Sequence, residues 1–245
     1  MANVHSVFLF IPCLVENFHP EIGQATARIL AGAGVRPVLP AGQTCCGQPL
    51  YKAGQVGQAR VLARRYLDVF ADPQPVVAPS GSCVAMIRKY PELFTDEPLL
   101  QQRAEDMAAR TFELTEFLVD RLGRQDLGVS FQARAVYHDS CQVGRALGIR
   151  RQPAALLSRV RGLELLDLER PETCCGFGGT FSLQFPELSG AMAQDKVAAI
   201  LASGADTLVS AEVSCLMNIQ GALDKQGQSV RCLHIAQVLD PGGDW

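Results

Sequence analysis

The sequence lacks any apolar run close to the ~20 residues that a membrane-spanning helix requires. The N-terminus carries no basic cluster, and the apolar run at residues 7–12 is too short for a signal-peptide core. The sequence also lacks a large excess of either charge, since 22 basic and 25 acidic side chains leave a net charge of −3. That balance argues against the strongly basic surface that nucleic acids or anionic membranes select. We therefore expect a cytoplasmic, soluble chain with no nucleic-acid partner and no membrane span.

Cofactor fingerprints for hydride transfer are missing as well. No Gly-x-Gly-x-x-Gly motif follows a predicted strand, so the sequence offers no recognisable flavin or nicotinamide site. The 245 residues, 48% of them hydrophobic, suffice for two small domains or one large one.

Cysteine, by contrast, is abundant, with nine residues. A Cys-Cys-Gly triplet occurs twice, at residues 45–47 and 174–176, and each copy has a single cysteine upstream and another downstream. The upstream distances are 32 and 33 residues and the downstream distances are 37 and 40. The chain therefore contains an internal repeat. Its two matched sets are Cys13, Cys45, Cys46 and Cys83, followed by Cys141, Cys174, Cys175 and Cys215.

Strand and helix patterns alternate along both halves. We predict strands at residues 4–12, 35–40, 75–79, 133–138, 163–168 and 207–211, with a last strand and helical turn within 230–239. We predict helices at residues 20–33, 55–70, from 84 onward, 153–160, 187–202 and 216–225, and one or two helices across 99–122. This order predicts an α/β fold of two similar Rossmann-like halves with parallel sheets. We place the boundary so that residues 1–125 form the N-terminal half and residues 126–245 the C-terminal half.

The predicted strands place the cysteines where ligands bind in such folds. Cys13, Cys83, Cys141 and Cys215 each follow a predicted strand, and the carboxyl ends of parallel strands form the ligand-binding edge. Near a helix N-terminus, the dipole and free N–H groups stabilise a thiolate. We expect each set of four to converge at one edge of its own half, which gives two sites.

Four thiolates per half match the ligand count of a [4Fe–4S] cluster or of a tetrahedral zinc ion. Adjacent cysteines suit a multi-iron cluster better, because their diverging side chains can reach different irons. Two other interpretations compete with metal binding. The cysteines can be buried packing residues, although eight in register make that a poor explanation. They can also form a metal-free thiol–disulfide oxidoreductase, although disulfides between adjacent residues are strained.

The cysteine motifs resemble the CCG, or cysteine-rich, domain of heterodisulfide reductases and of glycolate oxidase iron–sulfur subunits. The resemblance is strongest to the lactate-utilisation protein A family and covers nearly the whole chain. The stretches that carry it are residues 12–15, 42–49, 79–83, 138–141, 174–182 and 214–217.

This resemblance implies an iron–sulfur electron-transfer subunit of a complex that oxidises L-lactate to pyruvate. It implies two partners, a ferredoxin-like iron–sulfur subunit and a third lactate-utilisation subunit, and all eight patterned cysteines as ligands. Zinc is the alternative metal, with a structural or assembly role. The fuller family pattern closes with Cys-x-x-Cys, but Met86 and Asn218 stand at the closing positions here. That departure leaves four-cysteine [4Fe–4S] sites, or sites completed by a ligand other than cysteine.

Three polar residues are further candidates. His138 and Asp139 precede Cys141, and they can donate hydrogen bonds around a cluster, accept a proton from a hydroxy acid, or simply satisfy a turn. Arg145 can bind a carboxylate, although an arginine in such a loop is more often solvated. The ninth cysteine, Cys232, lies in an apolar run and is expected to be a small buried hydrophobic residue.

Overall fold

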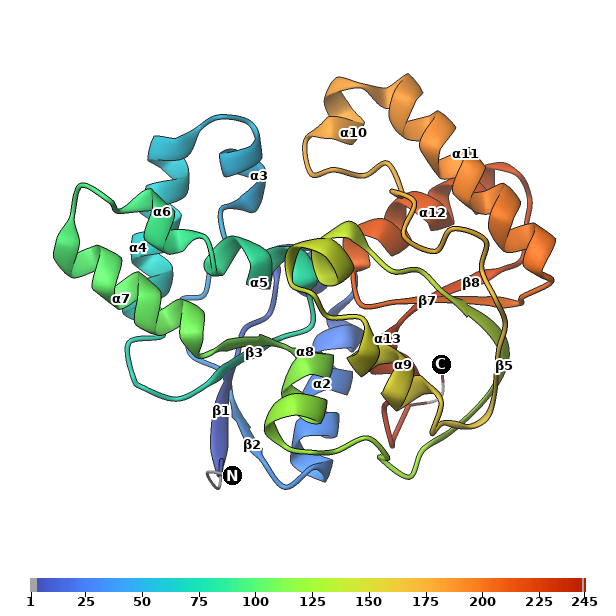
Figure 1. The fold of residues 1–245 in the computed structure, drawn as a ribbon, viewed down its shortest axis with the longest axis horizontal. Coiled ribbons are helices and arrows are strands. Elements are labelled where there is room, and N and C mark those ends of the chain that lie inside the picture. The colour runs from blue at the N-terminus through green and yellow to red at the C-terminus, as the bar shows by residue number, and fades with distance from the viewer. Residues whose placement is uncertain (1–3, 244) are drawn as a thin grey trace.

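The first half of the chain forms a four-stranded parallel sheet in the computed structural model, which describes residues 4–243 and 245 (Figure 1). The strand order is β2-β1-β3-β4, and each pair of neighbours is parallel. The strands are β1 (Ser6–Leu9), β2 (Arg36–Val38), β3 (Val76–Ala78) and β4 (Thr111–Glu113).

The second half repeats this sheet. Its strand order is β6-β5-β7-β8, again with every pair parallel, so corresponding strands occupy corresponding places. The strands are β5 (Ser130–Tyr137), β6 (Arg161–Leu165), β7 (Thr207–Ser210) and β8 (Arg231–His234). The predicted α/β class with two similar parallel halves is confirmed.

Helices connect the strands in both halves. In the first half they are α1 (Cys13–Phe18), α2 (Pro20–Gly32), α3 (Gln48–Lys52), α4 (Val56–Val69), α5 (Gly81–Ile87), α6 (Tyr90–Leu93), α7 (Pro98–Ala109), α8 (Leu114–Glu116) and the π-helix η1 (Phe117–Arg121). In the second half they are the π-helix η2 (Cys141–Ala146), α9 (Arg151–Leu157), α10 (Phe181–Gln184), α11 (Pro186–Ser203), α12 (Val213–Lys225) and α13 (Ile235–Val238).

Helical periodicity accounts for the longer helices. In α2, Ile22, Ala25 and Ile29 are buried at helical spacing, which places one apolar face against the sheet. Proline opens α2 at its first position, where the missing N–H costs no helical hydrogen bond. The helix α11 ends at Gly204, whose φ of 72° is left-handed and stops the helix.

One sequence prediction was wrong. Residues 99–122 were expected to contain one or two helices and no strand, but β4 lies within them at Thr111–Glu113 and pairs with β3. All three residues of β4 are buried, and no glycine or proline separates the strand from the helices on either side. Three residues are too few to show the alternating pattern of a strand in the sequence, and no turn residue marks where the strand begins or ends. The extended conformation of β4 is therefore determined by its pairing with β3.

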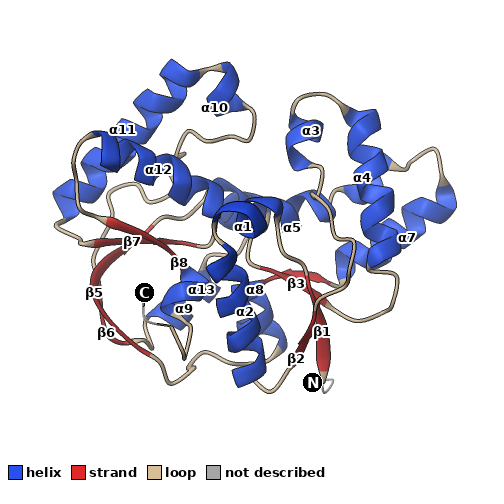
Figure 2. Ribbon diagram, turned by 180° about the vertical axis from the view of Figure 1, so that it is seen from behind, coloured by secondary structure: helices blue, strands red, loops and turns tan. Residues whose placement is uncertain are grey.

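The two halves meet through a shared hydrophobic core. One cluster of buried side chains contains Val7 and Leu9 of β1 together with Ala135 of β5 and Ile235 of α13. The helices α2, α8, α9 and α13 lie between the two sheets (Figure 2), and α2 contacts α13 while α8 contacts α9. The division into residues 1–125 and 126–245 stays a prediction.

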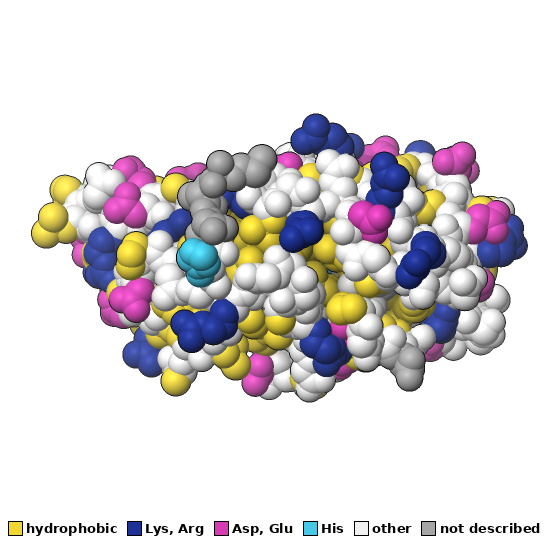
Figure 3. All heavy atoms as spheres, turned by 90° about the horizontal axis from the view of Figure 1, so that it is seen from below, with side chains coloured by type: hydrophobic (Ala, Val, Ile, Leu, Met, Phe, Trp, Pro, Cys, Tyr) yellow, Lys and Arg dark blue, Asp and Glu magenta, His cyan; other side chains and the backbone are white. Residues whose placement is uncertain are grey.

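The lower face of the molecule carries charges of both signs. Basic and acidic side chains are interspersed there, with hydrophobic atoms visible between them (Figure 3). Within residues 4–243 and 245, every helix is too short or too polar to cross a membrane.

Candidate metal centre

Two cysteines of the first half lie where a strand gives way to a helix. Cys13 is the first residue of α1, shortly after β1, and Cys83 lies in the first turn of α5, shortly after β3. Ser80 caps α5, because its hydroxyl accepts a hydrogen bond from the Cys83 backbone N–H at 3.4 Å. The predicted position of both cysteines at the carboxyl ends of strands agrees with the structure.

The first Cys-Cys-Gly triplet forms the loop that leads into α3. Gly47 has a φ of 84°, in the left-handed region that glycine adopts without strain. This turn directs the Gly47 backbone N–H at the Cys45 sulfur, 3.4 Å away. The loop therefore presents Cys45 with a backbone hydrogen bond that favours its thiolate.

The second half repeats these placements. Cys141 begins η2 after β5, and Cys215 lies in the first turn of α12 after β7. Gly176 has a φ of 88°, and its N–H donates to the Cys174 sulfur at 3.4 Å. A Cβ atom at Gly176 would lie 2.6 Å from the Ser189 carbonyl oxygen, so this position accepts only glycine.

Both cysteine sets open into a single cavity between the halves. Its volume is about 300 Å³, and all eight repeated cysteines line it, together with Glu212 and the apolar side chains of Phe177 and Leu183. Above α5, helices α3 and α10 stand opposite one another on the two sides (Figure 1). The two sets, which the sequence places at one edge of each half, face each other across this one space. The cysteines in it are Cys13, Cys45, Cys46, Cys83, Cys141, Cys174, Cys175 and Cys215.

Sulfur atoms crowd together in the first half. The Cys13 and Cys45 sulfurs are 3.7 Å apart. Hydrogen bonds from the Cys13 and Cys46 thiols lower the pKa of Cys45 to about 3. Hydrogen bonding to Cys45 and Cys83, together with burial, raises the pKa of Cys46 well above its usual range. One thiolate thus forms at the expense of its neighbours, and only a bound cation allows several to ionise together.

Cysteine sulfurs also lie close together in the second half. The Cys175 and Cys215 sulfurs are 2.8 Å apart, longer than a disulfide bond of about 2.05 Å. A hydrogen bond to Cys174 and burial both raise the pKa of Cys141. All nine cysteines of the chain are free thiols. Soft sulfur donors packed this closely are able to bind a metal ion or cluster.

His138 lies beside the second cysteine set. It is completely buried at the end of β5. Ligand atoms of His138, Cys175 and Cys215 all lie within 4.8 Å of one another. Burial, followed by the Lys196 charge, lowers the pKa of His138 to about 4, so its imidazole is neutral near pH 7.

None of the three polar candidates lines the cavity. Asp139 forms an ion pair with Arg150 at 3.1 Å and packs against Gly144, where an added Cβ would lie 2.1 Å from a carboxylate oxygen. Arg145 is exposed on η2. Among the described residues, His138, Asp139 and Arg145 are all absent from the cavity lining, although His138 lies next to the buried Cys175 and Cys215.

Other groups occupy the place of the missing closing cysteines. Asn218 donates a hydrogen bond from its side-chain amide to the Cys175 carbonyl oxygen at 2.7 Å. In the first half Met86 is buried, and the Tyr90 hydroxyl donates to the Cys46 carbonyl oxygen at 2.8 Å. Both triplet loops are therefore held by a hydrogen bond to the carbonyl of their second cysteine.

Sequence reasoning missed two buried charged residues near the cysteines. Glu212 directly precedes α12, makes no side-chain capping hydrogen bond to that helix, and is buried in the cavity wall. Lys196 of α11 is also buried, and its ammonium group donates to the carbonyl oxygens of Arg170 and Pro171 at 3.0 and 3.3 Å. An alignment of the two repeats could have drawn attention to Glu212. It lies three residues before Cys215, at the position that Ser80 holds before Cys83 in the first half.

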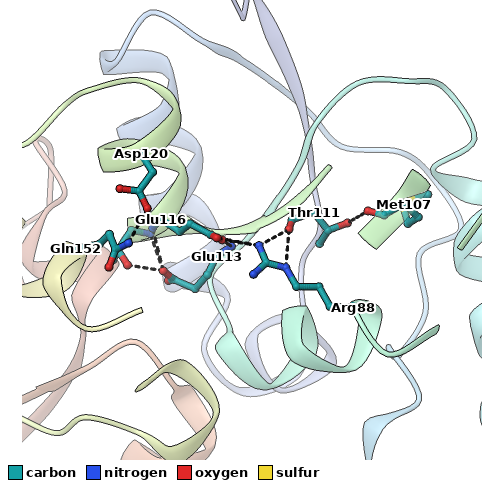
Figure 4. Close-up of polar contacts among 8 residues, drawn as sticks. Arg88, Met107, Thr111, Glu113, Glu116, Asp120 and Gln152 are labelled. Atoms are coloured by element: carbon teal, nitrogen blue, oxygen red, sulfur yellow. Dashed lines mark hydrogen bonds and ion pairs between the residues drawn. The ribbon is translucent and has the colours of Figure 1, made fainter. Parts of the chain in front are cut away.

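A polar cluster fixes the far end of α5, the helix that carries Cys83 (Figure 4). Arg88 follows α5, pairs with Glu116 at 2.7 Å and donates to the Thr111 carbonyl oxygen at 2.9 Å. Close by, Gln152 of α9 donates to Asp120 of η1 at 2.6 Å. The Arg88 contacts link the end of α5 to β4 and α8, and the hydrogen bond between Gln152 and Asp120 joins the two halves.

Comparison with known proteins agrees with this geometry. The family model described as a cysteine-rich domain matches twice, at residues 7–88 and 135–220. A curated relative from Exiguobacterium named Lactate utilization protein A is 47% identical over 97% of this chain and 98% of its own. The Bacillus subtilis protein of the same name is 43% identical over 96% of this chain and 98% of its own. The chain belongs to the lactate utilization protein A family.

The family match and the cavity concern the same residues. Both matched segments contain one complete set of four cysteines and leave out Cys232, which lies on β8. A crystal structure of a hypothetical protein from Helicobacter pylori shares the fold, with a TM-score of 0.60 at 9% identity. That likeness covers 98% of this chain but only 49% of the other, so this chain spans about half the length of its structural neighbour.

Proposed function

We propose that this chain is an iron–sulfur electron-transfer subunit that works with partner subunits in oxidising L-lactate to pyruvate. The observation that carries the proposal is the meeting of all eight repeated cysteines at one cavity. Family membership supports a role in lactate utilisation, because relatives of nearly the same length bear that name. The proposed partners are a ferredoxin-like iron–sulfur subunit and a third lactate-utilisation subunit.

The cavity matches iron–sulfur clusters both in the number of ligands and in its volume. Each half offers four sulfurs, which is the number of thiolates that a [4Fe–4S] cluster takes. The volume of about 300 Å³ is roughly ten times the share of one water molecule in the liquid, more than a lone ion needs. Closely spaced thiols that cannot all ionise alone gain a positively charged partner when they bind iron.

The chain itself supplies ligands, hydrogen bonds and shelter from water. A cluster bound here would gain and lose single electrons. The N–H groups of Gly47 and Gly176 point at cysteine sulfurs, and such hydrogen bonds help to set a reduction potential. Phe177 adds apolar surface to the cavity wall, which limits solvent access there, whereas Leu183 also lines the cavity but is 83% exposed.

The electron count of the reaction suits one-electron carriers joined in series. Oxidation of L-lactate to pyruvate releases two electrons and two protons. Clusters pass electrons one at a time, so this chain would relay the two electrons in succession to or from the ferredoxin-like partner.

A zinc-binding assembly role is the alternative, and one observation favours it. A ring nitrogen of His138 lies beside the sulfurs of Cys175 and Cys215. Structural zinc sites combine cysteine and histidine ligands in this way. Under this alternative the chain would hold the complex together and carry no electrons.

Growth on L-lactate tests the proposed role. A host strain lacking this gene would be complemented with Cys46→Ser, which alters the first set, and with Cys175→Ser, which alters the second. Cys232→Ser is the matched control, because Cys232 lies on β8 outside the cavity lining. We expect both set variants to lose growth on L-lactate but keep growth on pyruvate, and the control to grow on both. Normal growth of both set variants on L-lactate would contradict the proposal.

A further inference from the structure

The two halves differ at one position beside their cysteines. His138 lies three residues before Cys141, and Phe10 lies three residues before Cys13, at the matching place in the repeat. Both side chains are fully buried. Phe10 makes an edge-on contact with Tyr66, with ring centroids 5.1 Å apart. The second half thus carries an imidazole where the first half carries an apolar ring.

The His138 ring has one nitrogen engaged and one free. Nδ1 lies 3.1 Å from the Pro171 carbonyl oxygen, which can only accept, so Nδ1 carries the proton. Nε2 is buried and has no hydrogen-bond partner among residues 4–243 and 245. A buried acceptor without a partner carries a desolvation penalty that metal binding would relieve. The lone pair of Nε2 is therefore available to a metal.

His138 belongs to a group of three residues that are placed to bind a metal. His138, Cys175 and Cys215 are all buried, and their ligand atoms lie within 4.8 Å of one another. We infer that His138 Nε2 is a metal ligand of the C-terminal cysteine set, whereas the N-terminal set binds its metal through thiolates alone. This inference rests on the proposed function only in requiring that the cysteine sets bind metal.

The surroundings of His138 match those of metal-bound histidines. Such a histidine usually donates its second ring N–H to a carbonyl or carboxylate, which fixes its tautomer and orientation. Pro171 provides that carbonyl, and the same oxygen also accepts a hydrogen bond from Lys196 at 3.3 Å. Lys196 in turn holds the Arg170 carbonyl at 3.0 Å, so the loop that orients the imidazole is anchored to α11.

Asn218, at the closing position of the cysteine pattern in the second half, does not compete with His138 as the ligand other than cysteine. The Asn218 amide is committed to the Cys175 carbonyl oxygen and contacts Ser189 at 3.4 Å. We therefore place the ligand other than cysteine at His138, directly after β5, rather than on α12. A mixed nitrogen and thiolate site differs from an all-thiolate one, since histidine ligation raises the potential of an iron–sulfur centre. The two halves would then hold sites of different potential.

The test uses the anaerobically purified full-length chain, grown with isotopically labelled histidine. Electron–nuclear double resonance on the reduced protein, or on its cobalt-substituted form if the metal is zinc, reports any nitrogen bound to the metal. We expect a histidine nitrogen coupling in the wild type and in His5→Gln, since His5 is exposed. The coupling should vanish in His138→Cys, which supplies a thiolate and keeps the metal.

A second variant covers the case in which substitution affects folding. His138→Phe introduces the residue found in the first half. The histidine nitrogen coupling should vanish, and the second half should release its metal to a chelator faster than in the wild type, while the first half is unchanged. A wild-type spectrum without histidine nitrogen coupling, together with metal release at the wild-type rate in His138→Phe, would overturn the inference. Nitrogen coupling to cobalt in a zinc protein would uphold it while refuting the iron–sulfur function.

Discussion

Glu212 of the second half accepts a hydrogen bond from the Ser82 backbone N–H of the first half at 2.7 Å. The same carboxylate accepts from the Ser82 and Ser214 hydroxyls at 3.1 and 3.0 Å. Ser82 directly precedes Cys83, and Ser214 directly precedes Cys215. One buried side chain therefore ties together the two strand-to-helix turns that carry a cysteine from each set.

Removing this carboxylate should weaken the joint between the halves. Glu212→Ala leaves the Ser82 N–H and two hydroxyls without their acceptor in a buried place. Because a lost hydrogen bond to a charged group costs about 1.5–3 kcal/mol, we expect the free energy of unfolding to fall by roughly 3 kcal/mol. Urea unfolding of the anaerobically purified protein measures this. The exposed Glu105→Ala is the control, with a change within about 0.5 kcal/mol; equal losses in both variants would refute this role.

Close contact between the halves should make Gly81 intolerant of a side chain. A Cβ at Gly81 would lie 2.2 Å from a methyl of Val143 and 3.3 Å from the Val143 Cα atom. We expect Gly81→Ala to destabilise the protein by about 1–3 kcal/mol, because overpacking displaces neighbouring backbone. Gly221→Ala in α12 is the matched control, since no atom lies within 4 Å there, and it should stabilise by about 0.5–1 kcal/mol. Thermal unfolding compares the two, and a neutral Gly81→Ala would show that the halves can separate slightly without cost.

Stability should depend on pH through the buried carboxyl of Glu113. Burial raises the pKa of Glu113 from 4.5 to about 7, although Thr115 donates to it from both its backbone N–H and its hydroxyl. The folded state therefore holds its proton more tightly than the unfolded state. This contribution is fully present below pH 4.5 and is lost as the pH rises through about 7.

The matching variant isolates that contribution. In Glu113→Gln, the difference in unfolding free energy from wild type should change by roughly 3 kcal/mol between pH 4.5 and 7.5, following about 1.4 kcal/mol for each pKa unit. Urea unfolding at several pH values gives the curve, with exposed Glu105→Gln as control. A constant difference between wild type and Glu113→Gln across this range would contradict the raised pKa.

The buried ammonium of Lys196 should influence the reduction potential of the second half. The Cys175 and Cys215 thiolates act on the pKa of Lys196, which burial lowers overall, so this cation and the second cysteine set interact. Lys196→Met removes a positive charge, which makes electron uptake less favourable. We expect the potential to fall by tens of millivolts in a spectroscopic redox titration, whereas exposed Lys89→Met leaves it unchanged. A potential that rises in Lys196→Met would contradict this charge effect.

Much of the fold was predictable because it repeats. The doubled Cys-Cys-Gly triplet revealed the two halves, and apolar runs such as residues 75–79 and 207–211 marked strands that the structure contains. The strand β4 escaped prediction, because three buried residues between helices show no period of their own.

The candidate site was predictable only in part. Cysteine spacing correctly placed Cys83 and Cys215 after strands, since that depends on local sequence. The union of both sets in one cavity depends on how the halves dock, and no local pattern encodes that. The burial of Glu212 and Lys196 was not predicted for the same reason. Charged residues are mostly exposed, and whether one is buried depends on partners that the fold brings to it from elsewhere in the chain.

Metal analysis of the anaerobically purified protein tests the central claim most directly. Iron, zinc and acid-labile sulfide would be measured per chain, with electron paramagnetic resonance of the reduced form, for wild type, Cys46→Ser, Cys175→Ser and Cys232→Ser. The account predicts iron and sulfide in equal amounts, a cluster signal diminished in the first two variants, and wild-type values in Cys232→Ser. Stoichiometric zinc without sulfide would contradict it and would identify the chain as a structural subunit of its complex.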